Sequence, residues 1–378
     1  MTTAHVTPQD TAVSHLHPRG SFVIEDHRLP TGKEEVWRFT PIGQMEDFFD
    51  QMLERASMPI TLEAGPDKAW SWLKPGAFPR GSVLVPVDRP AAIAASEDQA
   101  RHVVIDGAHA DPIRLSIHGD GLDPSAAHLV IEAKPASSAT VVLTHTGLAR
   151  FIGNVEIRVG QAASLTVVTI QDWDRGSVHL GQHEALVDEG ATYRHIAVSL
   201  GGDLVRLQNN VSYAGSGGDA ELLGVYFADA GQHLEHRLFI DHNHPKGVSH
   251  VDYRGALQGE RAESVWVGDV LIRPAAVGIE TYEANKNLVL TDGCRVHAVP
   301  NLEIETGEIL GAGHSASTGR FDDEQLFYLK SRGITETEAR HLVVRGFFSA
   351  ILARIGLDDV AATLMSRIDK ELAFDKEN

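Results

Sequence analysis

From about Ser82 to about Ile309, short runs of alternating apolar and polar residues follow one another without a convincing amphipathic helix between them. Alternation with a period of two is typical of β-strands that bury one face. Turns rich in Gly, Asp, Asn and Pro separate the runs. A doubly wound α/β fold needs helices between its strands, so this pattern excludes that fold. Clear runs lie at 113–117, 155–159, 165–167, 193–200, 237–240 and 265–267.

The β region is compatible with a sandwich, a barrel or a β-solenoid. We find no clean internal repeat in the sequence, so periodicity does not choose among these three architectures. The sequence therefore predicts a mainly β protein but does not by itself fix how the strands are stacked.

Composition restricts the function. The chain has 378 residues and a formal net charge of −19. This acidity argues against a nucleic-acid partner, an anionic membrane surface and an acidic polysaccharide substrate, which are bound by Lys and Arg. Neither an apolar run long enough to cross a membrane nor a signal-peptide pattern is evident, so we expect a cytoplasmic protein.

Four segments are expected along the chain. A flexible tail is predicted over residues 1–20, a partly helical region over 21–81, the β core over 82–320 and a helical domain over 321–378. In the second segment, Met45–Ala56 has helical spacing.

In the C-terminal segment, Asp322 with Gln325 and Thr335 with Glu338 have capping-box spacing. Asp358 is expected to open a last amphipathic helix. Gly346 lies inside a helical pattern, which suggests that a close contact requires it.

Signatures of common enzymes are missing. The sequence contains no G-x-x-x-x-G-K-[ST] phosphate loop, no G-x-S-x-G elbow and no H-E-x-x-H helix. We therefore predict that the chain is not an enzyme.

A series of short motifs in a fixed order spans the end of the β region and the start of the helical segment. They are Asn285-Lys286-Asn287-Leu288, Pro300-Asn301-Leu302-Glu303-Ile304, Gly313-His314-Ser315-Ala316, Asp323-Glu324-Gln325-Leu326-Phe327-Tyr328, Ser331-Arg332-Gly333-Ile334 and Gly346-Phe347-Phe348. A second pattern, LPTGKEEVWRFT, occupies residues 29–40. Together they resemble the SufB/SufD family of iron–sulfur cluster assembly proteins, and its SufD branch most closely.

The resemblance implies a right-handed parallel β-helix core with flanking N-terminal and C-terminal helical regions. It also implies a non-catalytic scaffold subunit of a SufBCD complex, which pairs with a SufB-like chain and docks the SufC-like ABC ATPase. The residues expected to contribute to partner binding are Phe327, Tyr328, Arg345, Gly346, Phe347 and Phe348. No permanent cofactor is expected, only a transient iron–sulfur cluster or iron at the interface with SufB.

His314 is the candidate ligand that the resemblance singles out. It lies in the motif Gly313-His314-Ser315, which we expect to form a turn at the end of the β region. A neutral imidazole can ligate iron together with thiolates from a partner chain. Some SufD chains have a cysteine two residues earlier, whereas this chain has Ala312, so a sulfur ligand must come from elsewhere.

Cys294 and His297 form a Cys-x-x-His pattern that locally resembles the SufB version of this segment. A SufB-like homodimeric scaffold using Cys294 is therefore one alternative. The simpler interpretation is a small buried cysteine beside a solvent-facing histidine, because Cys294 is the only cysteine and cannot hold a cluster alone.

His242 and His244 suggest another alternative, a cupin-like metalloprotein. Two histidines in a His-x-His pattern on one strand would point their rings to the same face. Stacking or hydrogen bonding between turns of a β-helix is the preferred explanation of the histidines of this region, including His233 and His236.

Overall fold

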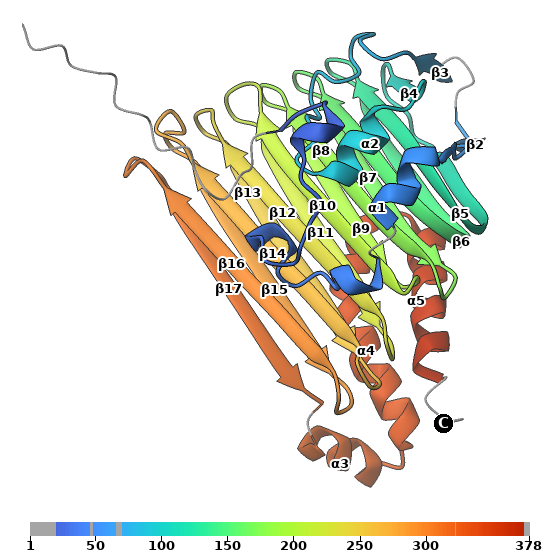
Figure 1. The fold of residues 1–378 in the computed structure, drawn as a ribbon. Helices are drawn as coiled ribbons and strands as arrows, with labels where there is room; N and C mark the ends of the chain where they lie inside the picture. The colour runs from blue at the N-terminus through green and yellow to red at the C-terminus, as the bar shows by residue number, and fades with distance from the viewer. Residues whose placement is uncertain (1–19, 46–47, 66–69, 322, 374–378) are drawn as a thin grey trace, which may run out of the picture.

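The computed structural model describes residues 20–45, 48–65, 70–321 and 323–373, and it shows a parallel β-solenoid with helices at both ends of the chain (Figure 1). The solenoid has about eight turns. The predicted parallel β-helix with flanking helical regions is thus confirmed. The tail expected over 1–20 lies, apart from Gly20, outside the described residues, as does Asp322.

Each full turn of the solenoid contributes one strand to each of two facing sheets. We call these the even sheet and the odd sheet, after the strand numbers. The even sheet contains β8 (Val178–Val187), β10 (Leu204–Tyr213), β12 (His233–His242), β14 (Glu263–Ile272) and β16 (Arg295–Ile304). The odd sheet contains β7 (Ser164–Trp173), β9 (Thr192–Ser199), β11 (Asp219–Ala228), β13 (Val248–Leu257), β15 (Glu280–Val289) and β17 (Gly311–Arg320).

Two long strands, β5 (Ile113–Ala133) and β6 (Ser138–Val159), join the sheets at the first turns. The first half of β6 pairs with β7 and the second half pairs with β8, so one strand enters both sheets. The remaining strands, β1 (Ala56–Ser57), β2 (Thr61–Ala64), β3 (Trp70–Leu73) and β4 (Ala100–Ile105), complete this end of the solenoid.

The space between the two sheets, here called the lumen, is filled by side chains. Alternate residues of both sheets point inward and form the main hydrophobic core, which includes Phe151, Trp173, Tyr193, Tyr253 and Trp266. The expected alternation of inward and outward residues is therefore present, but outward residues are also buried wherever another segment covers the sheet.

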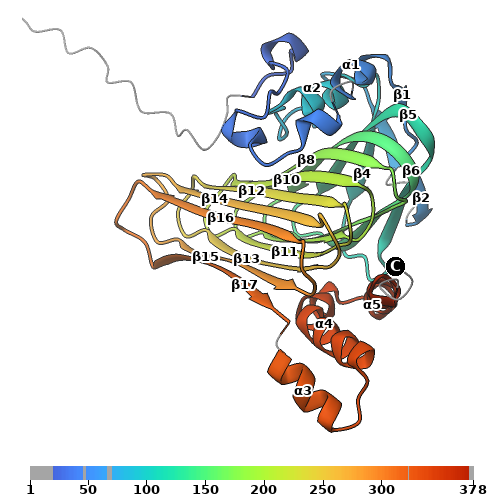
Figure 2. The same ribbon diagram turned by 60° about the horizontal axis from the view of Figure 1, so that its bottom comes forward.

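Different segments cover the two outer faces of the solenoid (Figure 2). The N-terminal region covers the even sheet, where Trp37, Phe48 and Phe49 pack against Leu180 and other outward residues. Its helical elements are η1 (Ile24–Asp26), η2 (Glu35–Trp37), η3 (Ile42–Gln44), α1 (Phe48–Gln51), η4 (Met52–Glu54) and α2 (Arg89–Ala95). The helix expected over Met45–Ala56 is therefore too long, because its described part breaks into a short α-helix, a 3₁₀ turn and the start of β1.

The C-terminal helices are α3 (Asp323–Ser331), α4 (Glu336–Leu352), η6 (Ala353–Ile355) and α5 (Asp358–Ala373). Of these, α4, η6 and α5 cover the odd sheet. The capping box of Thr335 with Glu338 is confirmed, because each side chain accepts a hydrogen bond from the other residue's backbone N–H. Asp358 opens α5 as expected. Within the described residues, no helix is sufficiently long and apolar to span a membrane.

Candidate functional site

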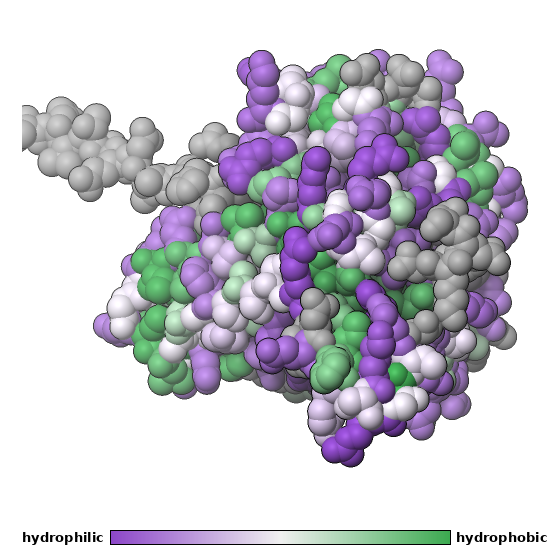
Figure 3. All heavy atoms as spheres, turned by 90° about the horizontal axis from the view of Figure 1, so that it is seen from below, coloured by the Kyte–Doolittle hydropathy of each residue, from purple (hydrophilic) through white to green (hydrophobic). Residues whose placement is uncertain are grey.

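The solenoid ends abruptly at β16 and β17, which each pair with only one described strand. No later turn covers their inward side chains, so Val296, Ala298, Leu302 and Ala312 pack on the core but stay partly exposed. Apolar side chains gather at this end of the molecule in the view from below (Figure 3). Leu310 is the most exposed large apolar side chain there, at 78%. We call this surface, formed by β16, β17 and Leu310, the open end.

His314 lies in the open end, within β17. The expected turn at Gly313–Ser315 is therefore wrong: small and polar residues in this segment indicated a turn, but the backbone continues as an edge strand. His314 pairs in register with Glu283 of β15, so both side chains point to the same side of the sheet. Its side chain is 44% exposed, which leaves the imidazole accessible from the open end.

Glu283 is a site residue that the motif analysis missed. Its side chain is only 2% exposed, and Nδ1 of His314 lies 4.0 Å from Oε1 of Glu283. Neither carboxyl oxygen has a hydrogen-bond partner among the residues that the structure describes. Burial, with a smaller contribution from the charge of Asp269, raises the pKa of Glu283 to about 8. A lone glutamate at an inward position of the alternating run Thr281–Asn287 was the available signal in the sequence.

Cys294 and His297 do not join His314. The Cys294 thiol donates a hydrogen bond to the carbonyl of Gly259 at 3.4 Å, and burial raises the pKa of this thiol. His297 lies on β16, where its Nε2 is 3.1 Å from Oε1 of Glu263 and its ring packs on Phe39 at 4.6 Å. Both side chains are thus partly buried and have partners within the chain, whereas the simpler interpretation expected a buried cysteine and a solvent-facing histidine.

The proposed His-x-His pair on one strand is wrong. His242 is the last residue of β12, whereas His244 lies beyond the strand. His242 is buried, with its Nε2 2.9 Å from Oγ of Ser249 and its ring stacked on Tyr213. Among the residues that the structure describes, no three His, Cys, Asp or Glu side chains gather in a way that could hold a metal ion.

Histidines instead form a column along the lumen. His145 packs on His179, His183 on His195, and His236 on both Tyr226 and Tyr253. Burial lowers the pKa of His145 and His236 to about 4 and that of His195 to about 3. These rings are therefore neutral core residues, and His236 contacts aromatic rings of the neighbouring strands β11 and β13 at tilted angles.

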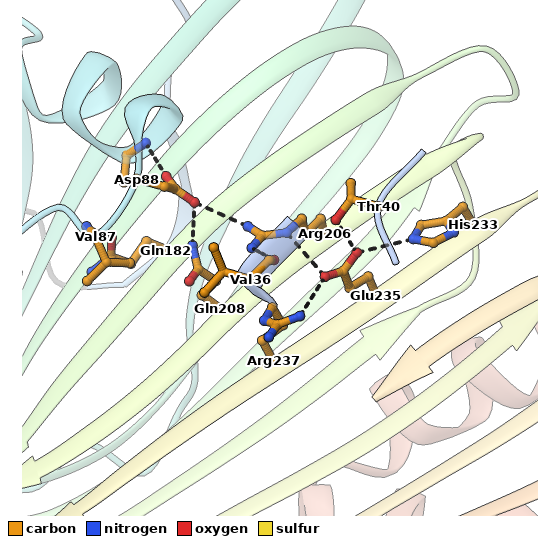
Figure 4. Close-up of polar contacts among 11 residues, drawn as sticks. Val36, Thr40, Val87, Asp88, Gln182, Arg206, Gln208, His233, Glu235 and Arg237 are labelled. Atoms are coloured by element: carbon orange, nitrogen blue, oxygen red, sulfur yellow. Dashed lines mark hydrogen bonds and ion pairs between the residues drawn. The ribbon is translucent and has the colours of Figure 1, made fainter. Parts of the chain in front are cut away.

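The N-terminal motif at residues 29–40 is tied to the even sheet by a buried polar network (Figure 4). Glu235 of β12 accepts hydrogen bonds from Thr40 at 2.7 Å and from Arg206 of β10 at 3.2 Å. Arg206 also pairs with Asp88, the N-cap residue of α2, and its guanidinium lies 4.0 Å from the centre of the Trp37 ring. Burial alone would raise the pKa of Glu235, but Arg206 and His233 outweigh it and lower the pKa to about 2.

The residues expected to bind partners divide into two groups. Phe327 and Tyr328 of α3 are 75% and 56% exposed. Phe348 of α4 is fully buried against the odd sheet, so the prediction that it contacts a partner is wrong.

The neighbours of Phe348 in α4 also have identified surroundings. Arg345 pairs with Asp369 of α5 at 3.1 Å, and Phe347 lies partly buried at the edge of the core. A Cβ added at Gly346 would meet no atom within 4 Å, so no close contact within this chain requires that glycine.

A shallow cavity of about 500 Å³ lies beside these exposed aromatics. It is lined by the loop after α3 and by one face of α4, with the residues Arg332, Gly333, Ile334, Glu338, His341, Leu342 and Arg345. In the ribbon views α3 stands away from the solenoid (Figures 1 and 2). An exposed helical surface with two aromatic residues therefore protrudes from the solenoid just beyond the end of β17.

Comparison with known proteins agrees with this architecture. Residues 116–347 match the family model described as "SUF system FeS cluster assembly, SufBD core domain". The chain is 47% identical over 363 residues to an iron–sulfur cluster assembly SufBD family protein of Mycobacterium tuberculosis, covering 93% of this chain and 91% of that protein. A Mycobacterium leprae protein of the same description is 46% identical over 379 residues, covering 96% of each chain. A Synechocystis relative is 29% identical over 213 residues, covering 56% of this chain and 46% of that protein.

Proposed function

Because this chain belongs to the SufBD family of iron–sulfur cluster assembly proteins, we propose that it is a SufD-type, non-catalytic scaffold subunit. In this proposal it acts in the cytoplasm, pairs with a SufB-like chain and docks a SufC-like ABC ATPase. The open end with His314 is the observation that carries the proposal. It combines an incomplete solenoid with a partly exposed imidazole at its edge.

Pairing through the open end follows from the chemistry of its strands. The free edges of β16 and β17 present backbone N–H and C=O groups, which readily pair with further strands. The partly exposed lumen residues favour a partner that continues the solenoid and covers them. A homologous β-solenoid fits both requirements, since its own last turn would present two parallel edges at the same spacing.

The ATPase is proposed to dock on α3 and the adjoining face of α4. Phe327, Tyr328 and Leu342 are more than half exposed there, and exposed aromatic groups are typical anchors of protein interfaces. The helices α4 and α5 pack on the odd sheet. In this proposal, their packing contacts transmit a rearrangement driven by ATP from the docking surface to the solenoid.

His314 is proposed to bind the cargo of the complex, which is iron or a nascent cluster. The imidazole can ligate iron, and the partner chain would supply the thiolates that this chain lacks. A SufB-like use of Cys294 has less support, because its thiol is hydrogen-bonded and its pKa is raised, whereas a reactive thiolate needs a lowered pKa.

Co-purification with a variant at the open end tests the pairing. Leu310→Asp places a charge on the most exposed apolar side chain of that surface, so we expect it to abolish co-purification of the homologous chain. The ATPase should still bind, and the thermal midpoint of the isolated chain should stay the same. Undiminished recovery of the homologous chain with Leu310→Asp would contradict pairing through the open end.

A further inference from the structure

We propose that Glu283 is a second iron-binding residue at the open end, so that its carboxylate and the imidazole of His314 form one half of a metal site. This inference rests on the proposed function of the open end as the place where iron is bound. It assigns a role to a residue that no motif indicated.

The register of the odd sheet brings the two side chains together. Glu283 and His314 are paired residues on neighbouring parallel strands, so their side chains stand next to each other on the lumen side. The 4.0 Å between Nδ1 and Oε1 exceeds hydrogen-bonding distance. Glu283 therefore does not serve to hold the His314 ring by a hydrogen bond in the free chain.

A packing role does not explain the carboxyl group either. Both oxygens of Glu283 are buried without a hydrogen-bond partner, and burying a polar group in this way costs free energy. Other charged side chains in the core, such as Glu235, are fully partnered. An unpartnered carboxyl beside a partly exposed imidazole is the arrangement expected where a further group, a cation, binds between them.

The opposite sheet leaves room for the carboxyl group. Gly268 of β14 faces Glu283 across the lumen, and a Cβ added there would clash with Oε2 of Glu283. Any side chain at position 268 would therefore displace the carboxyl group. Because Gly268 has no side chain, the carboxyl group of Glu283 fits into the last turn of the lumen, next to β17.

The donor types suit ferrous iron, and their number indicates a half-site. Carboxylate oxygen and imidazole nitrogen are both ligands of Fe²⁺ in proteins. The structure brings no third His, Cys, Asp or Glu to this pair within the described residues. The remaining ligands must therefore come from the chain that covers the open end.

The test measures Fe²⁺ affinity of the co-purified complex under anaerobic conditions, by competition with a chromophoric chelator. Glu283→Gln keeps the shape of the side chain and removes its charge, and His314→Ala removes the imidazole. We expect each variant to bind one equivalent of Fe²⁺ at least about tenfold more weakly. The loss of affinity in the double variant should differ from the sum of the two single losses, because both residues belong to one site and their contributions are coupled.

Glu184→Gln is the matched control. Glu184 is another buried glutamate whose pKa is raised by burial, to about 7, but it lies on β8, far along the solenoid from the open end. We expect it to leave Fe²⁺ affinity unchanged. Thermal midpoints of all variants separate loss of iron binding from loss of folding.

The possible outcomes distinguish failure of this inference from failure of the proposed function. Unchanged Fe²⁺ affinity in Glu283→Gln, with weakened binding in His314→Ala, would overturn this inference and leave the proposed function standing. Unchanged affinity in His314→Ala would refute the proposed role of His314 as well. If no homologous chain co-purifies, the pairing fails, and this inference fails with it, because the remaining ligands of the site are assigned to that chain.

Discussion

At the residue scale, this protein buries ionisable side chains in two contrasting ways. In the network of Figure 4, Arg206 and Glu235 satisfy each other and fasten the N-terminal segment to the even sheet. Glu283 is buried to a similar degree but has no hydrogen-bond partner. Buried groups that satisfy each other's hydrogen bonds fix a structure, whereas a buried carboxyl group without a hydrogen-bond partner points to a ligand.

Arg206→Met tests the structural network. This change leaves the buried carboxylates of Glu235 and Asp88 without their main cation, so we expect a loss of about 3–5 kcal/mol in the free energy of unfolding. Chemical denaturation measures it. Arg320→Ala removes an exposed ion pair with Asp292 and should cost no more than about 1 kcal/mol. Equal effects of the two substitutions would contradict the assigned importance of the buried network.

The histidines of the lumen predict how stability depends on pH. Burial lowers the pKa of His145, His236 and His242 to about 4 and that of His195 to about 3, against about 6.5 in the unfolded chain. Their contribution to stability is therefore complete above pH 6.5 and is lost as the pH falls toward 4. The raised pKa values of Glu184 and Glu283 act in the opposite direction between about pH 4.5 and 7, but these two groups are outnumbered.

His236→Leu isolates one of these contributions. Because one titrating group is removed, the slope of unfolding free energy against pH below 6.5 should decrease, by up to about 1.4 kcal/mol per pH unit. Denaturation at several pH values measures the slope. Leu238→Ala, a cavity-forming change in the same strand, should lower stability at every pH without changing the slope. An unaltered slope in His236→Leu would show that this ring does not resist protonation.

At the element scale, the sequence predicted which helices and strands exist better than it predicted what packs around them. The capping box of Thr335 and the start of α5 at Asp358 were predictable because caps are local. The strand β17 was mistaken for a turn because its composition is small and polar, with Gly311, Gly313 and Gly319. An edge strand with no turn above it needs no apolar alternation, so the usual signal of a strand is missing there.

Exposure of the aromatic residues in α3 and α4 was likewise not predictable, because it depends on which helix face meets the odd sheet. Phe348→Ala should cost about 3–5 kcal/mol of unfolding free energy, since it leaves a cavity against that sheet. Phe327→Glu should change stability by less than about 0.5 kcal/mol and prevent binding of the ATPase. Denaturation and a binding assay with the purified ATPase measure both effects, and normal ATPase binding by Phe327→Glu would refute docking on α3.

At the scale of the whole molecule, the solenoid lacks a visible repeat because the offset between paired strands changes. Leu204 pairs with His233, His233 with Glu263, and Glu263 with Arg295, at offsets of 29, 30 and 32 residues. Turns of unequal length therefore hide a regular architecture, and only the resemblance to a family indicated it. The position of Glu283 beside His314 follows from this register and could not be read from the spacing of the motifs.

The central claim is that this chain is a scaffold whose open end takes part in cluster assembly through His314. The most direct test is the yield of iron–sulfur cluster, followed by its visible absorbance, on the co-purified complex carrying His314→Ala. We predict that the complex forms in normal amount and that cluster yield falls severely, because the partly exposed imidazole is removed without disturbing the core. An intact complex with normal cluster yield would contradict the account.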